Sequence, residues 1–222
     1  MCGRFTLTAS GEELAEAFDL DSAPSLTPRY NIAPSQPVLV VRPTAGGLGR
    51  ETASLGWGFE ASGEGPPRLL INARAQTADR LPSFRDSFRA RRCLVPASGF
   101  YEWQRTAKPR QPYYIHRRDG RPFALAGLWR PAPPGGESGA CLILTTEPNE
   151  LVAPLHDRMP VILTPADRAL WLAADGLGPA TLRRLFAPFS AAAMAAHPVS
   201  TTVNDVRNDS AHCLAPVRTL FG

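Results

Sequence analysis

The sequence predicts an α+β fold: one domain with a curved, mainly antiparallel, barrel-like β core and helices at its periphery. Segments with strand character outnumber segments with helical periodicity, and the two kinds do not alternate regularly, which disfavours a doubly wound parallel sheet. With 222 residues and 44% hydrophobic content, the chain is long enough to bury one sizeable core. The polar stretches 60–67 and 131–138 separate no segments of different composition. We therefore expect a single domain over residues 1–222, with these stretches as surface loops.

The first elements expected are a strand containing Cys2, a helix and a valine-rich strand. Ser10 and Glu13 have the spacing of a capping box and precede apolar positions, which predicts a short amphipathic helix over about residues 11–19. Residues 36–42 are rich in valine and are followed by the turn-forming residues 44–47. This pattern predicts a strand.

The later elements are mainly strands. Asp119-Gly120 lies between the apolar segments 113–116 and 123–129 and predicts a hairpin, because this dipeptide tolerates the positive φ angles of a tight turn. Residues 141–146 and 161–163 predict buried strands. Thr164 followed by Pro165 predicts the start of a helix, and residues 179–186 predict a further short helix.

Composition excludes several classes of protein. No apolar run approaches the roughly 20 residues that span a bilayer, and no signal pattern precedes Glu12, so we expect a cytoplasmic protein without membrane contact. The four cysteines form no C-x-x-C pair, which argues against a zinc site and a disulfide framework. All but one of the 24 cationic residues are arginine, a bias that either a GC-rich genome or a phosphate-binding surface explains. No residue cluster requires a metal or a cofactor.

Cys2 stands directly behind the initiator Met1. Removal of Met1 would leave a 1,2-aminothiol, with an amine of pKa about 8 and a thiol of about 8.5, both partly nucleophilic near neutral pH. Such a pair captures an aldehyde as a Schiff base and then closes a thiazolidine ring. The alternative is an ordinary buried cysteine.

Two internal segments place polar residues in apolar surroundings. Asn72 and Arg74 follow an apolar run, and strand alternation puts them on one face, where they suit a sugar and a phosphate; a strand-capping asparagine and a solvated arginine are the alternative. Glu102 lies among aromatic residues, and desolvation raises a glutamate pKa toward neutrality, as a proton-shuttling group requires. An ion-paired glutamate is the alternative. Trp103 suits either stacking on a nucleobase or core packing.

His156 lies in a charged loop before an expected buried strand, where catalytic residues concentrate. With an ordinary pKa near 6.5 it can donate or accept a proton, and Arg158 can contact phosphate. A structural histidine is the alternative. His116, His197 and His212 lack a comparable setting, and we expect them to be structural.

Taken together, six sequence blocks resemble the SOS-response-associated peptidase (SRAP) family, occur in the family's order and cover nearly the whole chain. They are Met-Cys-Gly-Arg-Phe at the N-terminus, Arg29-Tyr30-Asn31-Ile32-Ala33-Pro34, Ile71-Asn72-Ala73-Arg74, Gly99-Phe100-Tyr101-Glu102-Trp103, His156-Asp157-Arg158-Met159-Pro160 and His197-Pro198-Val199-Ser200. The resemblance implies a single-domain fold with a barrel-like β core. It also implies a protein that binds abasic sites in single-stranded DNA and links to them covalently through its N-terminal cysteine.

The resemblance further implies roles for individual residues. Cys2 would capture the aldehyde of the ring-opened sugar, Asn72 would hold the sugar, Glu102 would relay protons, and His156 would assist ring opening and Schiff-base chemistry. A weaker β-elimination (lyase) reaction and peptidase removal of Met1 are also implied. The residues expected to contact DNA are Arg4, Asn31, Arg74, Trp103 and Arg158.

Two other functions stay open at this point. An N-terminal-nucleophile peptidase acting on proteins would use Cys2 with His156 or Glu102 as base. A non-covalent single-stranded DNA-binding protein would use the arginines and Trp103 and would not need the thiol. The loop 57–67 departs from the family, since its residues 58–65 offer only Phe59 and two acids where some members carry further aromatic residues against DNA. We expect a monomer.

Overall fold

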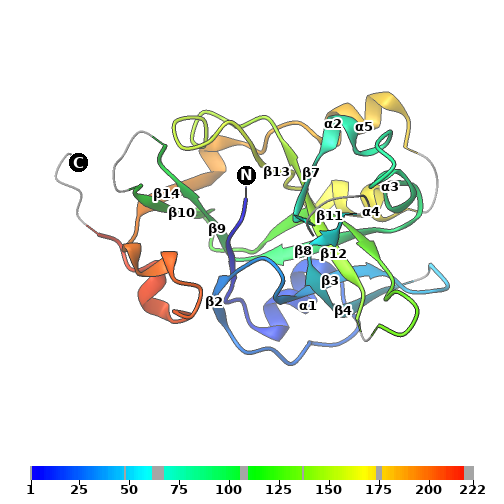
Figure 1. Ribbon diagram of the computed structural model, residues 1–222, viewed down its shortest axis with the longest axis horizontal. Coiled ribbons are helices and arrows are strands. Elements are labelled where there is room, and N and C mark those ends of the chain that lie inside the picture. The colour runs from blue at the N-terminus through cyan, green and yellow to red at the C-terminus, as the bar shows by residue number, and fades with distance from the viewer. Residues whose placement is uncertain are drawn as a thin grey trace.

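The computed structural model describes residues 2–47, 49–61, 68–105, 110–136, 138–173 and 177–217. Over these residues the chain is an α+β fold built on two large sheets, with short helices on the outside (Figure 1). The predicted fold class is confirmed, including the curved and mainly antiparallel β core.

The larger sheet curls into a ring. Its strands follow the order β11 (Phe123–Arg130), β8 (Arg92–Ala97), β3 (Pro37–Pro43), β4 (Arg50–Trp57), β12 (Ala140–Thr146) and β13 (Met159–Pro160). Because β11 also pairs with β12, the strands from β11 to β12 close on one another. β12 runs parallel to β4 and to the short strand β7 (Asn72–Arg74), whereas the ring's other pairings are antiparallel.

The second sheet holds the start of the chain. Its strands follow the order β14 (Met194–Pro198), β10 (Pro112–Arg117), β9 (Gly99–Trp103), β1 (Phe5–Leu7) and β2 (Arg29–Ile32). β1 therefore lies between β9 and β2. It begins three residues after Cys2, so the prediction that the first strand contains Cys2 is wrong. A two-stranded sheet of β5 (Phe59–Glu60) and β6 (Leu69–Leu70) completes the strands.

The helices are peripheral, as expected. In α1 (Gly11–Phe18) the capping box forms, because Ser10 Oγ accepts from the Glu13 N–H while the Glu13 carboxylate accepts from the Ser10 N–H. Thr164 precedes α4 (Pro165–Leu172), but its hydroxyl donates to the Asp167 carboxylate (2.6 Å) instead of accepting from the backbone. The remaining helices are α2 (Ala75–Ala78), α3 (Arg85–Ala90), α4 (Pro165–Leu172), α5 (Pro179–Leu185) and the 3-10 helices η1 (Ala191–Ala193), η2 (Thr201–Asn204) and η3 (Ala211–Leu214).

The predicted hairpin at Asp119-Gly120 is wrong. The turn itself forms, with Gly120 at φ 72°. However, β10 pairs with β9 and β14, and β11 pairs with β8 and β12, so neither strand has an edge free for the other. The chain instead passes from one sheet to the other at this turn.

Two smaller differences concern a strand and a loop. The strand expected at residues 161–163 is displaced to β13, and Ile162 forms only an isolated bridge with Leu125. In the expected loop 60–67, Glu60 pairs with Leu69. Residues 62–67 lie outside the described residues, as does Met1.

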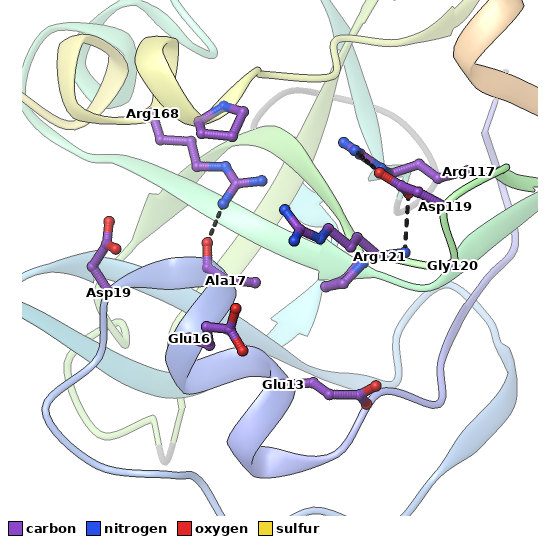
Figure 2. A pocket seen from close by; sticks show the side chains of 11 residues that line it. Glu13, Glu16, Ala17, Asp19, Arg117, Asp119, Gly120, Arg121 and Arg168 are labelled. Carbon is purple, nitrogen blue, oxygen red and sulfur yellow. Dashed lines mark hydrogen bonds and ion pairs between the residues drawn. The ribbon is translucent and has the colours of Figure 1, made fainter.

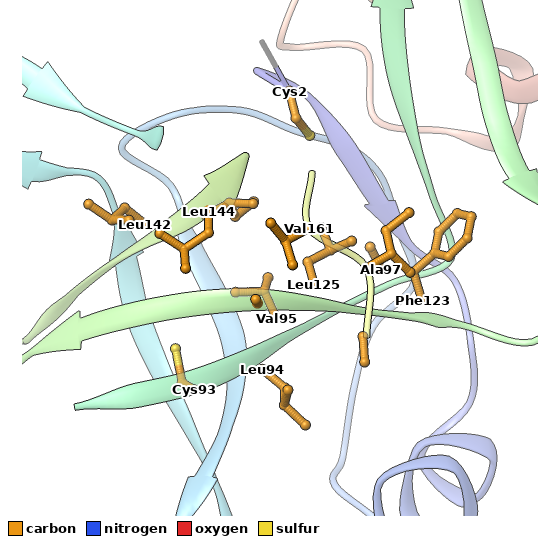
Figure 3. Packing of buried hydrophobic residues seen from close by; sticks show 14 of the residues in the cluster. Cys2, Cys93, Leu94, Val95, Ala97, Phe123, Leu125, Leu142, Leu144 and Val161 are labelled. Carbon is orange, nitrogen blue, oxygen red and sulfur yellow. The ribbon is translucent and has the colours of Figure 1, made fainter. Parts of the chain in front are cut away.

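The hydrophobic core fills the ring. Figure 3 shows Val95, Leu125 and Leu144, from three neighbouring strands, gathered beside Val161. Cys2 lies at the margin of this cluster with its side chain directed toward it, and it is fully buried. No helix in the described part of the chain is long and apolar enough to cross a membrane.

Candidate functional site

The fold brings Cys2 together with segments that lie far from it in sequence. Asn72 begins β7 at the margin of the ring, Glu102 lies in β9 beside β1, and His156 lies in the connection between β12 and β13. Cys2 contacts Asn72 directly and interacts electrostatically with Glu102. The four residues predicted to be catalytic therefore belong to elements that meet near the start of the chain.

Asn72 holds the backbone of Cys2. Its Nδ2 donates a hydrogen bond of 2.8 Å to the carbonyl oxygen of Cys2. Its Oδ1 is buried and has no hydrogen-bond partner among the residues that the structure describes. A buried acceptor without a partner costs free energy, and this oxygen retains the capacity to accept a hydrogen bond. Ala73 is buried between half-buried Asn72 and exposed Arg74, which confirms that the latter two share a face.

The thiol of Cys2 differs from the expectation for an exposed cysteine. Burial raises its pKa well above the usual range, and the negative charge of Glu102 raises it further. The Sγ contact with the Arg4 carbonyl is long, at 4.0 Å. The prediction that the thiol is partly ionised near neutral pH is therefore wrong, because it ignored desolvation. In this structure Cys2 carries a neutral thiol that needs a base to become a nucleophile.

Glu102 has the raised pKa that its aromatic surroundings predict. The residue is 3% exposed, and burial raises its pKa to about 7. The positive charges of the chain's amino terminus and of Arg105 oppose this rise. Near neutral pH this carboxyl is therefore divided between its acid and base forms, which suits a group that both takes up and releases protons.

His156 has a partner for each of its protonation states. Burial is the largest cause that lowers the pKa of His156, and the positive charges of the amino terminus and Arg105 lower it further. The neutral ring is therefore favoured. The neutral ring accepts the Arg158 N–H at Nδ1 (3.0 Å). Asp157 Oδ1 lies 2.9 Å from the same nitrogen and can accept a hydrogen bond from it in the charged ring. Nδ1 therefore has a hydrogen-bond partner in either protonation state of the ring.

Arg4, Asn31 and Trp103 form one interlocked group. Arg4 Nη1 donates to Asn31 Oδ1 and to the Val203 carbonyl, both at 2.7 Å, and its guanidinium lies 5.8 Å from the centre of the Trp103 ring. Asn31 is fully buried, and its Nδ2 contacts three carbonyl oxygens, those of Val203, Asp205 and Asn208. Its side chain thus makes its hydrogen bonds within the protein. A contact between Asn31 and DNA stays a prediction, and the burial of the side chain disfavours it.

Arg74 and Arg158 lie on the other flank of the site. Arg158 Nη2 donates to Gln76 Oε1 (2.9 Å) and to the Thr145 carbonyl. Burial lowers the pKa of Arg158, and repulsion from Arg74 lowers it further, so the two cations are close together. Arg74 is exposed. Two neighbouring guanidinium groups next to Asn72 suit a phosphate group.

Arg105 is the residue that sequence reasoning missed. It is the second residue after β9, and its Nη2 lies 3.0 Å from Asp157 Oδ1 and 3.2 Å from His156 Nε2. No local motif marks it, because its partners lie more than 50 positions along the chain.

Phe59, His116 and His197 pack against other residues, whereas His212 is exposed. Phe59 is 1% exposed and lies under the guanidinium of Arg130, so it offers no ring to DNA. His116 packs in parallel on the Tyr114 ring, and His197 Nε2 lies 3.0 Å from the Leu214 carbonyl oxygen. Among the described residues, no three His, Cys, Asp or Glu side chains gather as a metal site requires.

A separate cavity of about 500 Å³ lies between α1, the β10–β11 turn and α4 (Figure 2). Arg117 pairs there with Asp119, and Arg168 donates to the Ala17 carbonyl at the end of α1. Asp19, also on its wall, pairs with Arg50. None of the predicted site residues lines this cavity, so the Cys2 site and this cavity are distinct.

Comparisons with known proteins give consistent matches. The family model described as SOS response associated peptidase (SRAP) matches residues 1–206. The abasic site processing protein YoqW of Bacillus subtilis is 39% identical over 219 residues, covering 95% of this chain and 97% of that protein. The abasic site processing protein YedK of Escherichia coli is 31% identical over 236 residues, covering 98% and 100%. A crystal structure of a protein from Bacteroides thetaiotaomicron shares the fold, with a TM-score of 0.79 at 23% identity, covering 98% of this chain and 100% of that one.

Proposed function

This chain belongs to the SOS response associated peptidase (SRAP) family, and from that premise we propose that it captures abasic sites in single-stranded DNA through a covalent bond to Cys2. The names of the relatives YoqW and YedK support abasic-site processing as the activity. Residues 1–222 act as one domain and as a monomer in the cytoplasm, and the chemistry requires no cofactor.

The observation that carries the proposal is the hydrogen bond from Asn72 to the Cys2 carbonyl beside a buried Glu102 of pKa about 7. A structural cysteine needs neither feature. A residue whose own amine reacts needs both, because its backbone must be held and a base must accept a proton near neutral pH.

The first covalent step uses the amine. After removal of Met1, Glu102 takes a proton from the Cys2 ammonium, and the amine adds to C1′ of the ring-opened deoxyribose. His156 assists opening of the sugar ring by proton transfer at the ring oxygen. Glu102 returns the ammonium proton to the hydroxyl of the resulting adduct, which leaves as water. The iminium so formed loses its N–H proton to solvent, which gives a Schiff base between the Cys2 nitrogen and C1′ and leaves Glu102 as a carboxylate. Asn72 Oδ1 accepts a hydrogen bond from the bound sugar.

The second step uses the thiol. Sγ of Cys2 adds to the same carbon and closes a thiazolidine ring, while the thiol proton passes through Glu102 to the nitrogen. Atoms balance with water as the by-product, and no electron is transferred. Because burial keeps the thiol neutral, the amine reacts first and the thiol follows only when Glu102 accepts its proton.

The DNA lies across both flanks of Cys2. Arg74 and Arg158 bind phosphates on one side, and Arg4 with Trp103 binds on the other, where the indole offers a stacking surface. Asn31 acts mainly by fixing Arg4.

Two further activities follow from the same chemistry. A Schiff base acidifies C2′, so removal of that proton expels the 3′ phosphate by β-elimination. Ring closure by the thiol competes with this lyase reaction, because it consumes the imine. The chain also takes part in removing Met1, the one peptidase activity that we propose for it.

The test is a Cys2→Ala variant mixed with an abasic oligonucleotide. We expect wild-type protein to form an adduct that survives denaturation, and the variant to form none while keeping salt-sensitive DNA binding. Cys2-dependent cleavage of unrelated peptides would favour a general peptidase, and DNA binding without any wild-type adduct would favour a non-covalent binding protein.

A further inference from the structure

Arg105 joins the two segments that carry the proposed acid–base groups. It follows Glu102 by three residues, at the end of β9. Its Nη2 reaches the β12–β13 connection, at 3.0 Å from Asp157 Oδ1 and 3.2 Å from His156 Nε2. One guanidinium thus stands between the elements that hold Glu102 and His156.

We propose that Arg105 is a positioning residue for the Cys2 reaction: it orients the His156 loop and keeps Glu102 and His156 in their proton-accepting forms. This inference rests on the proposed function, since it assigns a part in the same reaction. In this proposal Arg105 acts through His156 and Glu102 and not on the sugar.

The electrostatics support this role for both groups. Arg105 lowers the pKa of Glu102, against the effect of burial, and so favours the carboxylate. It also lowers the pKa of His156, in the same direction as burial, and so favours the neutral ring. In each case the form that Arg105 favours is the one that can take a proton.

Other groups act on the same two side chains. Glu102 interacts with Cys2 and the amino terminus, and Tyr113 of β10 lies opposite it in register. The charge of Asp157 raises the pKa of His156, so Asp157 and Arg105 act on the ring in opposite directions. Because Arg105 also pairs with Asp157, its loss removes a positive charge and releases a negative one beside His156. Both effects favour the protonated ring.

Replacing Arg105 should test its positioning role without preventing the protein from folding. The side chain of Arg105 is 53% exposed, and ion pairs at such positions contribute little to stability. We therefore expect Arg105→Gln and Arg105→Lys to fold. Arg121→Gln is a matched control, because Arg121 is also exposed but lies at the β10–β11 turn, beside the cavity of Figure 2.

The experiment measures the rate of Cys2-dependent adduct formation from pH 5.5 to 8.5. For Arg105→Gln we expect the acid limb of the profile to move up by about half a pH unit, which lowers the rate about threefold at pH 6 and by less than about 1.5-fold at pH 8. Arg105→Lys keeps the charge and should return the midpoint toward wild type. Arg121→Gln should match wild type.

A second readout needs no DNA. NMR titration of the His156 ring should show a higher pKa in Arg105→Gln than in wild type. An equal fall in rate at every pH, with an unchanged His156 titration, would overturn the inference and make Arg105 a DNA contact. Unchanged rates with an unchanged titration would overturn it as well. If wild-type protein forms no adduct, the proposed function fails, while the titration still tests the effect of Arg105 on His156.

Discussion

The pH dependence of adduct formation tests the role of Glu102. With a pKa of about 7, its carboxylate fraction is about one half at pH 7 and about one tenth at pH 6. If Glu102 is the base, the step that it serves should slow about fivefold between these pH values and quicken about twofold from pH 7 to 8. Glu102→Gln should lower the rate by about 10²- to 10⁴-fold, as loss of a general base does.

The amine of Cys2 titrates in the same range, so the wild-type rate alone does not isolate Glu102. The informative quantity is the ratio of wild-type to Glu102→Gln rates at each pH, because the lesion contributes equally to both, and the ratio reports the whole effect of the Glu102 charge, including its effect on the amine. Single-turnover mixing with an abasic oligonucleotide, followed by denaturing electrophoresis, gives the rates. Intact mass must first establish that Met1 is absent from both proteins. A ratio that stays constant from pH 6 to 8 would refute the reasoning.

The same residues give three further predictions. Glu102→Gln should stabilise the fold at pH 8 by as much as about 3 kcal/mol. The pKa of Glu102 is higher in the folded than in the unfolded state, so wild-type stability falls as pH rises from about 4.5 to 7. Below about pH 4.5, melting curves of the two proteins should agree. Asn72→Asp should slow capture by about three- to tenfold, because a carboxylate cannot donate to the Cys2 carbonyl; an unchanged rate would remove Asn72 from the account. Asn31→Ala should lower the free energy of unfolding by about 1–3 kcal/mol, because its buried side chain loses hydrogen bonds to three carbonyl oxygens. Arg74→Gln should leave stability unchanged and reduce the salt dependence of DNA binding by about one counterion. If instead Asn31→Ala reduced the salt dependence and Arg74→Gln reduced stability, Asn31 would be the DNA contact.

Local signals in the sequence were sufficient where local contacts decide the structure. The capping box of Ser10 and Glu13 joins residues three apart, so spacing alone predicts α1. The Asp119-Gly120 turn is likewise local, and it forms. The hairpin fails because strand pairing is decided elsewhere: β9, β14, β8 and β12 occupy the edges that β10 and β11 would have shared. The hydrophobic periodicity and the turn residues of a segment carry no information about which other strands compete to pair with it.

In the candidate site too, local sequence predicts some features, whereas others depend on contacts between residues far apart in the chain. The aromatic neighbours of Glu102 in sequence predict its desolvation, and its raised pKa follows. For Cys2, a buried cysteine was the alternative, but the residues around it did not decide between burial and exposure, so the expectation of a partly ionised thiol was wrong. Asn31 was identified through family resemblance, but its contacts with η2 and the loop after it become visible only in three dimensions. Arg105 required knowledge of a contact 51 residues away.

The most direct test of the central claim is the mass of the adduct and the atom to which it is attached. Mature protein incubated with an abasic strand, denatured and digested, should yield an N-terminal peptide that begins at Cys2 and carries the sugar on a residue with neither a free amine nor a free thiol. A sugar bound to any other residue, or to a Cys2 whose thiol still reacts with an alkylating reagent, would contradict the proposed ring closure.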